Sequence, residues 1–228
     1  MHILGLNIDK IDALVLSHSH FDHTGGLEAV VKNNFNIPIY AHNHLLDKRY
    51  AEIDNVMKFV GISDNDEKLL KQRITILDDM PIEVLPDLWT TGGIINKSEP
   101  LGSSPFLYVH NDDGYSPDPY LDDISLVLRT IKGIIIICGC CHAGLLNTLF
   151  HVREHFGGPI ISVVGGAHLV YSDTEYLDHV IDIISKSFQG TKFYLNHCTG
   201  KSALQKFENE FSGFVEYFLA GKMIVFFD

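Results

Sequence analysis

Three imidazoles and a carboxylate occupy six consecutive residues, His18-Ser19-His20-Phe21-Asp22-His23, directly after the apolar run 11–16. The run predicts a buried strand, and Thr24-Gly25-Gly26 predicts a turn that follows the motif. Imidazole and carboxylate are ligands that zinc and other borderline metals prefer. The alternative is a solvated histidine-rich loop. A strand that leads into a Gly-containing turn favours a rigid site, so the motif predicts metal binding.

Length and composition limit the class of protein. The chain has 228 residues, of which 46% are hydrophobic and 20% charged, as expected for an ordered globular protein. We interpret it as a single domain, 1–228. Its net charge of −12 argues against binding nucleic acid or an anionic membrane, because both require a basic face. A small-molecule substrate is the expected partner.

The apolar runs and cysteines indicate the cellular compartment. No run approaches the ~20 apolar residues of a membrane span, and residues 1–5 lack the features of a signal peptide. We therefore expect a cytoplasmic protein. Four cysteines in a chain of this length do not form a disulfide scaffold, so reduced thiols are expected.

Strand-like and helix-like segments alternate, which predicts a layered α/β architecture with mixed sheets. Residues 41–80 are interpreted as a helical insertion over one edge of the core. Helices are predicted at 26–34, 143–156, 199–211 and, from a capping box at Ser172-Asp173-Thr174-Glu175, up to Phe188. Strands are predicted at 11–16, 37–40, 89–95, 106–110, 125–130, 133–138, 159–164, 191–196 and 223–227.

Three further histidines follow predicted strands. His142, His168 and His197 each have a glycine within three residues, which leaves room for a sharp turn. Each alone is compatible with a core or capping histidine. Together with His18 they suggest four strand ends that converge on one crevice, the usual ligand position in layered α/β folds.

These motifs resemble the metallo-β-lactamase superfamily, whose signature is His-x-His-x-Asp-His after a strand. Within it, the chain resembles the 7,8-dihydropterin-6-methyl-4-(β-D-ribofuranosyl)aminobenzene 5′-phosphate synthase-like subgroup. The resemblance covers nearly the whole chain and implies an αββα sandwich. It rests on residues 16–27, Asp122-Asp123 before a strand, and the stretches 139–144, 165–169 and 197–200.

The resemblance implies a centre of two divalent ions, expected to be zinc, with manganese or iron as alternatives. His18, His20 and His142 would bind the first ion, and Asp22, His23 and His197 the second. The superfamily often has a bridging carboxylate, and none stands at the expected place. A second ion with few anionic ligands is expected to bind more weakly.

A metal-dependent hydrolase is the function that the resemblance implies. Two cations would lower the pKa of a shared water from ~15.7 toward neutrality, so that a metal-bound hydroxide is available as nucleophile. Asp22 would accept a proton from it, and His168 would donate to the developing negative charge. Asp122 or Asp123 either orients the imidazoles or caps a turn. The expected substrate is a pterin-like or phosphorylated small molecule.

The cysteines and several other polar residues have competing interpretations. Cys138 and Cys141 have CxxC spacing, but a structural role is favoured over a redox pair or zinc knuckle. One of Cys140 and Cys141 is expected to line the pocket, Cys198 likewise, and none is the nucleophile. His42 and His44 are interpreted as surface or lid residues. Lys48, Arg49 and Lys97 are solvated positions or, alternatively, contacts for an anionic substrate.

Two other function classes remain open. One is an iron-dependent sulfur dioxygenase-type oxidoreductase, and the other is a non-catalytic ligand-binding protein on the same scaffold. Only seventeen residues precede His18, whereas related chains have further strands there. We therefore expect the usual N-terminal strands to be missing. Their absence would expose a sheet edge and favour self-association as a homo-oligomer.

Overall fold

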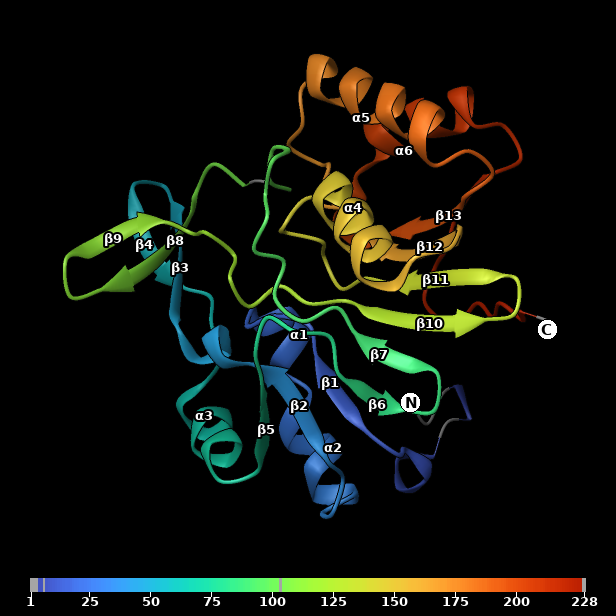
Figure 1. Cartoon of the computed structure of the whole chain (residues 1–228). Helices are drawn as coiled ribbons and strands as arrows, with labels where there is room; N and C mark the ends of the chain where they lie inside the picture. Colours follow the sequence, from blue (N-terminus) through green and yellow to red (C-terminus); the bar gives the residue numbers. More distant parts are fainter. Residues whose placement is uncertain (1–3, 6, 103, 227–228) are drawn as a thin grey trace. The chain divides into compact units, whose positions relative to one another are not determined.

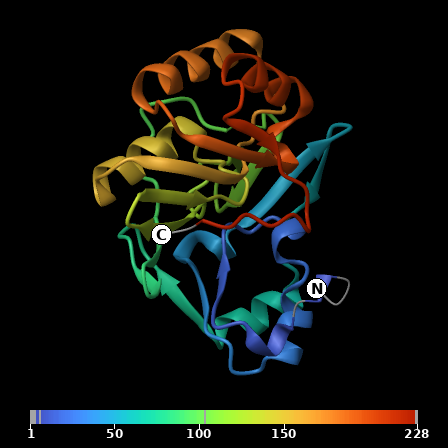
Figure 2. The same ribbon diagram turned by 90° about the vertical axis from the view of Figure 1, so that its right-hand side faces the viewer.

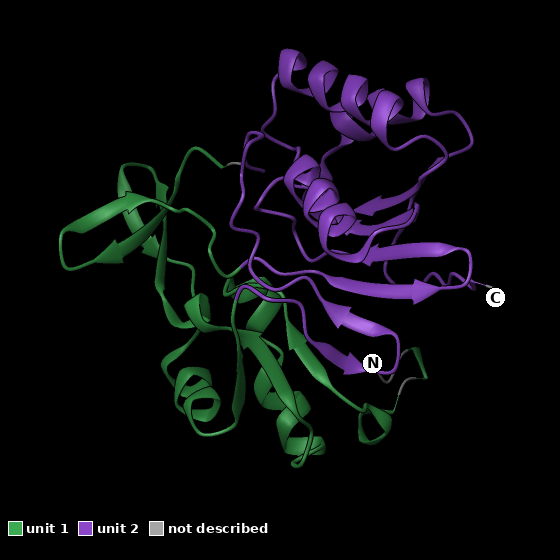
Figure 3. Cartoon of the chain, in the orientation of Figure 1, with its two compact units in different colours: residues 1–78, 104–122 green, residues 79–103, 123–228 purple. Residues whose placement is uncertain are grey.

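The computed structural model describes residues 4–5, 7–102 and 104–226, and the chain forms two compact units (Figure 3). Unit 1 lies within residues 1–78 and 104–122, and unit 2 within residues 79–103 and 123–228. Each unit therefore combines two separate stretches of sequence. The expectation of a single domain over residues 1–228 stays a prediction.

A three-stranded parallel sheet of order β1-β2-β5 forms the core of unit 1. Parallel neighbours require crossover connections, and helices α2 and α3 lie within them. Leu16, Leu27, Ile39 and Leu70 pack together in the core that these elements share. The elements are η2 (Ile8–Lys10), β1 (Leu14–Leu16), α1 (Phe21–Thr24), α2 (Leu27–Asn33), β2 (Ile39–His42), α3 (Asp64–Lys71) and β5 (Ile74–Leu77).

A four-stranded antiparallel sheet, of order β4-β3-β8-β9, completes unit 1. Its strands are β3 (Lys48–Ile53), β4 (Val56–Phe59), β8 (Leu107–Asn111) and β9 (Gly114–Pro117). The interpretation of residues 41–80 as a helical insertion is therefore wrong for most of its length. Within that range, the described helical segments are η3 (Asn43–Leu46) and α3.

The turn between β3 and β4 explains why these residues form a hairpin. Asp54 and Asn55 both have left-handed backbone, with φ of 54° and 59°. Two consecutive residues with positive φ match the type I′ turn, whose twist suits a two-residue hairpin. Asp and Asn are among the residues that tolerate this conformation, so the dipeptide was a hairpin signal that the charged pattern obscured.

Unit 2 contains a seven-stranded mixed sheet of order β14-β13-β12-β11-β10-β7-β6. Strands β11 to β14 run parallel to one another, whereas β10, β7 and β6 pair antiparallel. The strands are β6 (Glu83–Leu85), β7 (Leu88–Thr90), β10 (Leu126–Thr130), β11 (Gly133–Ile137), β12 (Ile160–Gly166), β13 (Lys192–Asn196) and β14 (Val215–Tyr217).

Three helices cover one face of this sheet (Figures 1 and 2). They are α4 (Leu145–Phe156), α5 (Thr174–Ser187) and α6 (Lys201–Glu210). Each helix contributes apolar side chains to the core, among them Leu149 of α4, Ile181 of α5 and Phe207 of α6. The strands contribute Ile136 and Phe193 to the same core. The helix start predicted near residue 172 is confirmed, but its N-cap is Asp173 rather than the Ser172 of the predicted capping box, because Asp173 accepts a hydrogen bond from the Tyr176 amide at 2.8 Å.

Two strands predicted in unit 2 differ from the structure. The strand expected at 89–95 ends at Thr90, since Gly92 has a φ of +68° that breaks extended backbone. Residues 223–226 form no strand, and Phe227 lies outside the described residues. The Phe226 ring instead contacts Tyr194 edge-on at 6.5 Å. Apolar composition alone does not distinguish a strand that pairs with a sheet from an apolar tail that does not.

None of the helices within the described ranges has the length and apolar character that a membrane span requires. All four cysteines lie in the described part of the chain, and none forms a disulfide. The expectation of reduced thiols agrees with this structure.

A pair of substitutions tests the β3–β4 turn. Asn55→Val should lower the free energy of unfolding by about 1–2 kcal/mol, because a β-branched residue is strained at positive φ. Asn55→Gly, the matched control, should be neutral or stabilising, since glycine adopts this conformation without strain. Urea unfolding measures both. Equal stability of the two variants would contradict the turn geometry.

The stability of unit 2 should depend on pH through His151 of α4. Burial lowers the pKa of His151 below its usual 6.5, although the Thr91 carbonyl, which accepts a hydrogen bond from Nε2 at 2.9 Å, raises it in part. Below about pH 6.5 the unfolded chain therefore binds a proton more readily than the folded chain, and stability falls as pH falls. His151→Gln keeps a donor but does not titrate. Its unfolding free energy should decline less steeply than wild type between pH 7.5 and 5, and equal slopes would contradict the assignment.

Candidate metal centre

The histidine motif of unit 1 spans the connection from β1 to α1. His18 and His20 lie two residues apart in the segment that follows β1, and His20 is the N-cap residue of α1. Their rings meet edge-to-face with centroids 4.9 Å apart, and the His23 ring lies 4.2 Å from that of His18. The structure therefore gathers the three imidazoles that the sequence predicts as ligands.

Asp22 stands beside this group on α1. Its Oδ2 lies 3.5 Å from Nε2 of His23, and the Asp22 side chain is 41% exposed. His18 and His20 are buried, and the Ser17 hydroxyl contacts Nδ1 of His18 at 3.1 Å. A hydroxyl on one ring nitrogen is the kind of contact that fixes the tautomer of a ligating imidazole.

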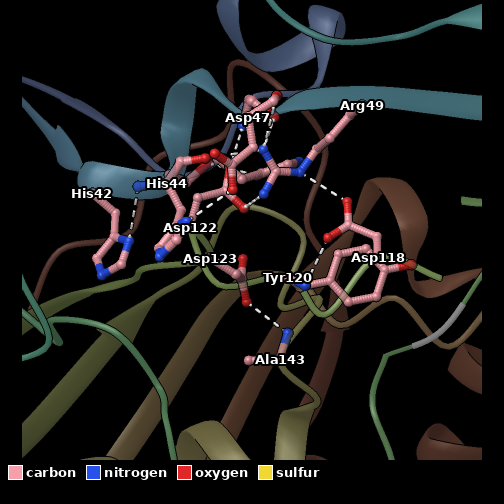
Figure 4. A network of polar contacts seen from close by, with 12 residues as sticks. His42, His44, Asp47, Arg49, Asp118, Tyr120, Asp122, Asp123 and Ala143 are labelled. Carbon is pink, nitrogen blue, oxygen red and sulfur yellow. Dashed lines mark hydrogen bonds and ion pairs between the residues drawn. The ribbon is translucent and has the colours of Figure 1, made fainter. Parts of the chain in front are cut away.

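Ser19, between His18 and His20, is held by the buried ion pair of Arg49 and Asp122. Figure 4 shows the two side chains of this pair. The Ser19 amide donates to Asp122 Oδ2 at 2.8 Å, and Arg49 Nη1 donates to the Ser19 hydroxyl at 2.8 Å. Arg49 Nη2 and Asp122 Oδ1 are themselves 2.8 Å apart. Asp122 therefore supports the backbone of the motif, a role that sequence reasoning left open between orienting imidazoles and capping a turn.

A second carboxylate completes the surroundings of Arg49. Asp118 Oδ2 accepts from Arg49 Nε at 2.8 Å, and Asp118 Oδ1 accepts from the Tyr120 amide at 2.7 Å. Arg49 is only 1% exposed. The alternatives of a solvated position or a substrate contact are therefore wrong for Arg49. The sequence around Arg49 carried no signal that it pairs with two buried carboxylates.

Burial and charge act in opposite directions on this pair. Burial raises the pKa of Asp122 to about 6, although Arg49 and the Ser19 amide lower it. Burial lowers the pKa of Arg49, but Asp122, Asp118 and Asp47 outweigh it and the pKa rises. Arg49 therefore stays positively charged, because guanidinium groups do not deprotonate in proteins.

In unit 2, His142, His168 and His197 follow three adjacent parallel strands, β11, β12 and β13. The carboxyl ends of such strands share one edge of the sheet, so the expected convergence holds within this unit. The His142 and His168 rings have centroids 4.1 Å apart. His197 opens the short helix η4 (His197–Thr199).

Cys140 lies between two of these histidines. Its Sγ is within 4.8 Å of a ring nitrogen of His142 and of a ring nitrogen of His197. Sequence reasoning considered Cys140 for the pocket wall but not as a candidate metal ligand. His142, two residues away, was the available signal, since thiolate and imidazole both bind zinc.

Three non-glycine residues of these loops adopt left-handed backbone. Cys141, His168 and His197 have φ of 63°, 44° and 50°. Such conformations cost on the order of 1–3 kcal/mol each and are concentrated at functional sites. Asp123 stabilises the loop of His142, because its Oδ2 accepts from the Ala143 amide at 2.8 Å (Figure 4).

The donor set fits divalent metal ions of the borderline class. Unit 1 gathers imidazoles with a carboxylate, and unit 2 gathers imidazoles with a thiol, all of them zinc ligands. The division of the six predicted ligands between two ions combines residues of both units and stays a prediction.

The interpretation of His42 as a surface or lid residue is wrong. His42 is buried, and its Nδ1 accepts a hydrogen bond from the His44 amide at 3.4 Å, which caps η3.

Removal of the Arg49 charge should destabilise the protein strongly. Arg49→Met leaves the Asp118 and Asp122 carboxylates buried without their partner, so the free energy of unfolding should fall by about 3–5 kcal/mol. Arg49→Lys keeps a charge but loses the forked geometry, and should lose less. Urea unfolding at pH 7 measures both. A loss below about 1 kcal/mol for Arg49→Met, as for an exposed pair, would contradict this account.

Comparison with known proteins places the chain among its relatives. Residues 1–94 match the sequence profile of the metallo-beta-lactamase superfamily. The chain is 32% identical to 7,8-dihydropterin-6-methyl-4-(beta-D-ribofuranosyl)-aminobenzene-5′-phosphate synthase of Methanocaldococcus jannaschii, over 99% of this chain and 79% of that protein. It is 31% identical to the uncharacterized protein MJ0448 of the same organism, over 95% of this chain and 79% of that protein.

A solved structure supports the same relationship. The crystal structure of Tm1679, described as a metal-dependent hydrolase of the beta-lactamase superfamily, aligns with a TM-score of 0.79 and 25% identity. The alignment covers 94% of this chain and 78% of that one. The α/β, metallo-β-lactamase-like fold expected from the sequence is therefore confirmed. The chain belongs to the metallo-β-lactamase superfamily and is similar over nearly its whole length to the dihydropterin-type synthase of that superfamily.

Proposed function

We propose that this protein is a metal-dependent hydrolase that acts on a pterin-like or phosphorylated small molecule. The observation that carries the proposal is the cluster of His18, His20 and His23 at the end of β1, in a chain that belongs to the metallo-β-lactamase superfamily. The name of the synthase relative supports the substrate class, and the description of Tm1679 as a metal-dependent hydrolase supports the reaction type.

The proposed ligands form two sets. His18, His20 and His142 hold one divalent ion, and Asp22, His23 and His197 hold the other. Imidazole and carboxylate favour zinc, while manganese and iron remain compatible with the same donors. The superfamily relationship supports this division, and the clustering of the imidazoles within each unit is consistent with it.

The chemistry follows from the charges and donors at the centre. Divalent ions bound there supply Lewis acidity and lower the pKa of a water toward neutrality. Asp22, partly exposed beside His23, accepts the proton that the nucleophile releases. His168 donates a hydrogen bond to the substrate oxygen on which negative charge develops, and its left-handed backbone holds the ring beside His142.

The remaining expectations about partners are part of the proposal. The net charge of −12 supports a small-molecule substrate rather than nucleic acid or an anionic membrane surface. A homo-oligomer and a cytoplasmic location stay predictions.

Metal analysis of ligand variants tests the proposal. The wild-type protein should bind two equivalents of zinc, and His20→Ala and His142→Ala should each lose at least one. Their hydrolytic rates should fall by at least about 100-fold, more than for loss of a supporting contact. Elemental analysis and a screen of phosphoesters, lactones and thioesters with zinc, manganese or cobalt measure these effects. His179→Ala is the control, since His179 is half-exposed and pairs with Glu99.

Three results would contradict the proposal in distinguishable ways. Unchanged metal content in both ligand variants would exclude the proposed ligand set. Inactivity on every substrate, together with tight ligand binding, would favour a non-catalytic binding protein. Iron content with oxygen consumption after anaerobic purification would favour the sulfur dioxygenase alternative.

A further inference from the structure

Cys140 lies close to two histidines that are candidate metal ligands. Its Sγ lies within 4.8 Å of a ring nitrogen of His142 and of a ring nitrogen of His197. The proposed function, on which this inference rests, gives His142 and His197 to different ions. We propose that the Cys140 thiolate bridges the two metal ions.

The distances suit this role. With Zn–S of about 2.3 Å and Zn–N of about 2.0–2.1 Å, a sulfur and a nitrogen on one tetrahedral zinc lie roughly 3.5 Å apart. A separation of at most 4.8 Å therefore closes with a small movement of either side chain. Paired ions in two-metal sites lie about 3.5–4 Å apart, a distance that two Zn–S bonds from one sulfur span.

The fold fixes Cys140 where three strands end. The Gly166 amide of β12 donates to the Gly139 carbonyl at 3.0 Å, and the Cys198 thiol after β13 donates to the Cys140 carbonyl at 3.5 Å. A Cβ at Gly166 would lie 2.7 Å from the Gly139 oxygen and 3.3 Å from Cys140 Cα. Glycine at 166 is therefore required for this close approach, which brings Cys140 toward His197.

The neighbouring cysteines have a different environment. Cys138 and Cys141 belong to the apolar core of unit 2. The Cys141 Sγ contacts the Thr148 hydroxyl of α4 at 3.1 Å. These contacts make Cys141 a structural thiol. Cys140, by contrast, faces two imidazoles.

Charge balance favours the same role. The six proposed ligands include one anion, Asp22, against two divalent cations. A bridging thiolate adds a second negative charge shared by both ions, and so offsets the weak binding expected for the second ion. Thiolate is also the softest donor in the set, which favours zinc over manganese.

X-ray absorption spectroscopy of the wild-type protein loaded with two zinc ions tests the bridge directly. A thiolate shared by both ions gives an average of about one sulfur neighbour per zinc, at about 2.3 Å. A terminal thiolate on one ion gives about half that number, and no coordination gives none. Either lower result would overturn the bridge, and neither depends on activity.

Substitutions distinguish the loss of the thiolate ligand from a disturbance of the fold. Cys140→Ser should bind its second zinc at least about tenfold more weakly. Cys140→Asp should keep both ions and lose the sulfur signal, because a carboxylate also bridges. Cys138→Ala, the matched control at a thiol of the apolar core, should keep the signal and the stoichiometry. Two zinc ions in wild type without sulfur would overturn only this inference, whereas no bound metal would overturn the proposed function as well.

Discussion

The buried pair of Arg49 and Asp122 supports the histidine motif of unit 1. Both side chains contact Ser19, one through the hydroxyl and the other through the backbone amide, between His18 and His20. Buried charges are costly unless they are paired and hydrogen-bonded, so this arrangement persists only when every partner is in place. The spacing of the imidazoles therefore depends on a strand of the antiparallel sheet, far from the motif in sequence. A site held in this way is pre-organised before any ligand binds.

In unit 2, the candidate ligands are held in place by the backbone rather than by a buried ion pair. There the candidate ligands lie on loops that follow three parallel strands, and close approach of the loops requires glycine at 166. Left-handed backbone at His168 and His197 directs side chains from sharp turns, at a cost that the surrounding core offsets. A rigid sheet below and strained loops above are a frequent arrangement for sites that must hold several donors at fixed distances.

Sequence reasoning recovered the elements whose signals are local. The strand before His18 and the helices of unit 2, including the start of α5, were predicted close to their observed bounds. The hairpin of β3 and β4 was missed, because its charged residues also suit a helix and its signal lay in two turn residues, Asp54 and Asn55. The tail at 223–226 was predicted as a strand because of its apolar composition, whereas it pairs with no strand and Phe226 contacts the Tyr194 ring.

The sequence by itself determined the superfamily of this protein, the types of its candidate metal ligands and their position after strands. Only the tertiary structure decided which other residues serve the site. Arg49 has no distinctive local pattern and Cys140 has only the nearby His142, because the contacts of each depend on a partner distant in the chain: Asp122 for Arg49 and His197 for Cys140. Local spacing encodes what a segment can bind, whereas the pairing of strands determines which segments meet, because that pairing depends on burial summed over the whole chain.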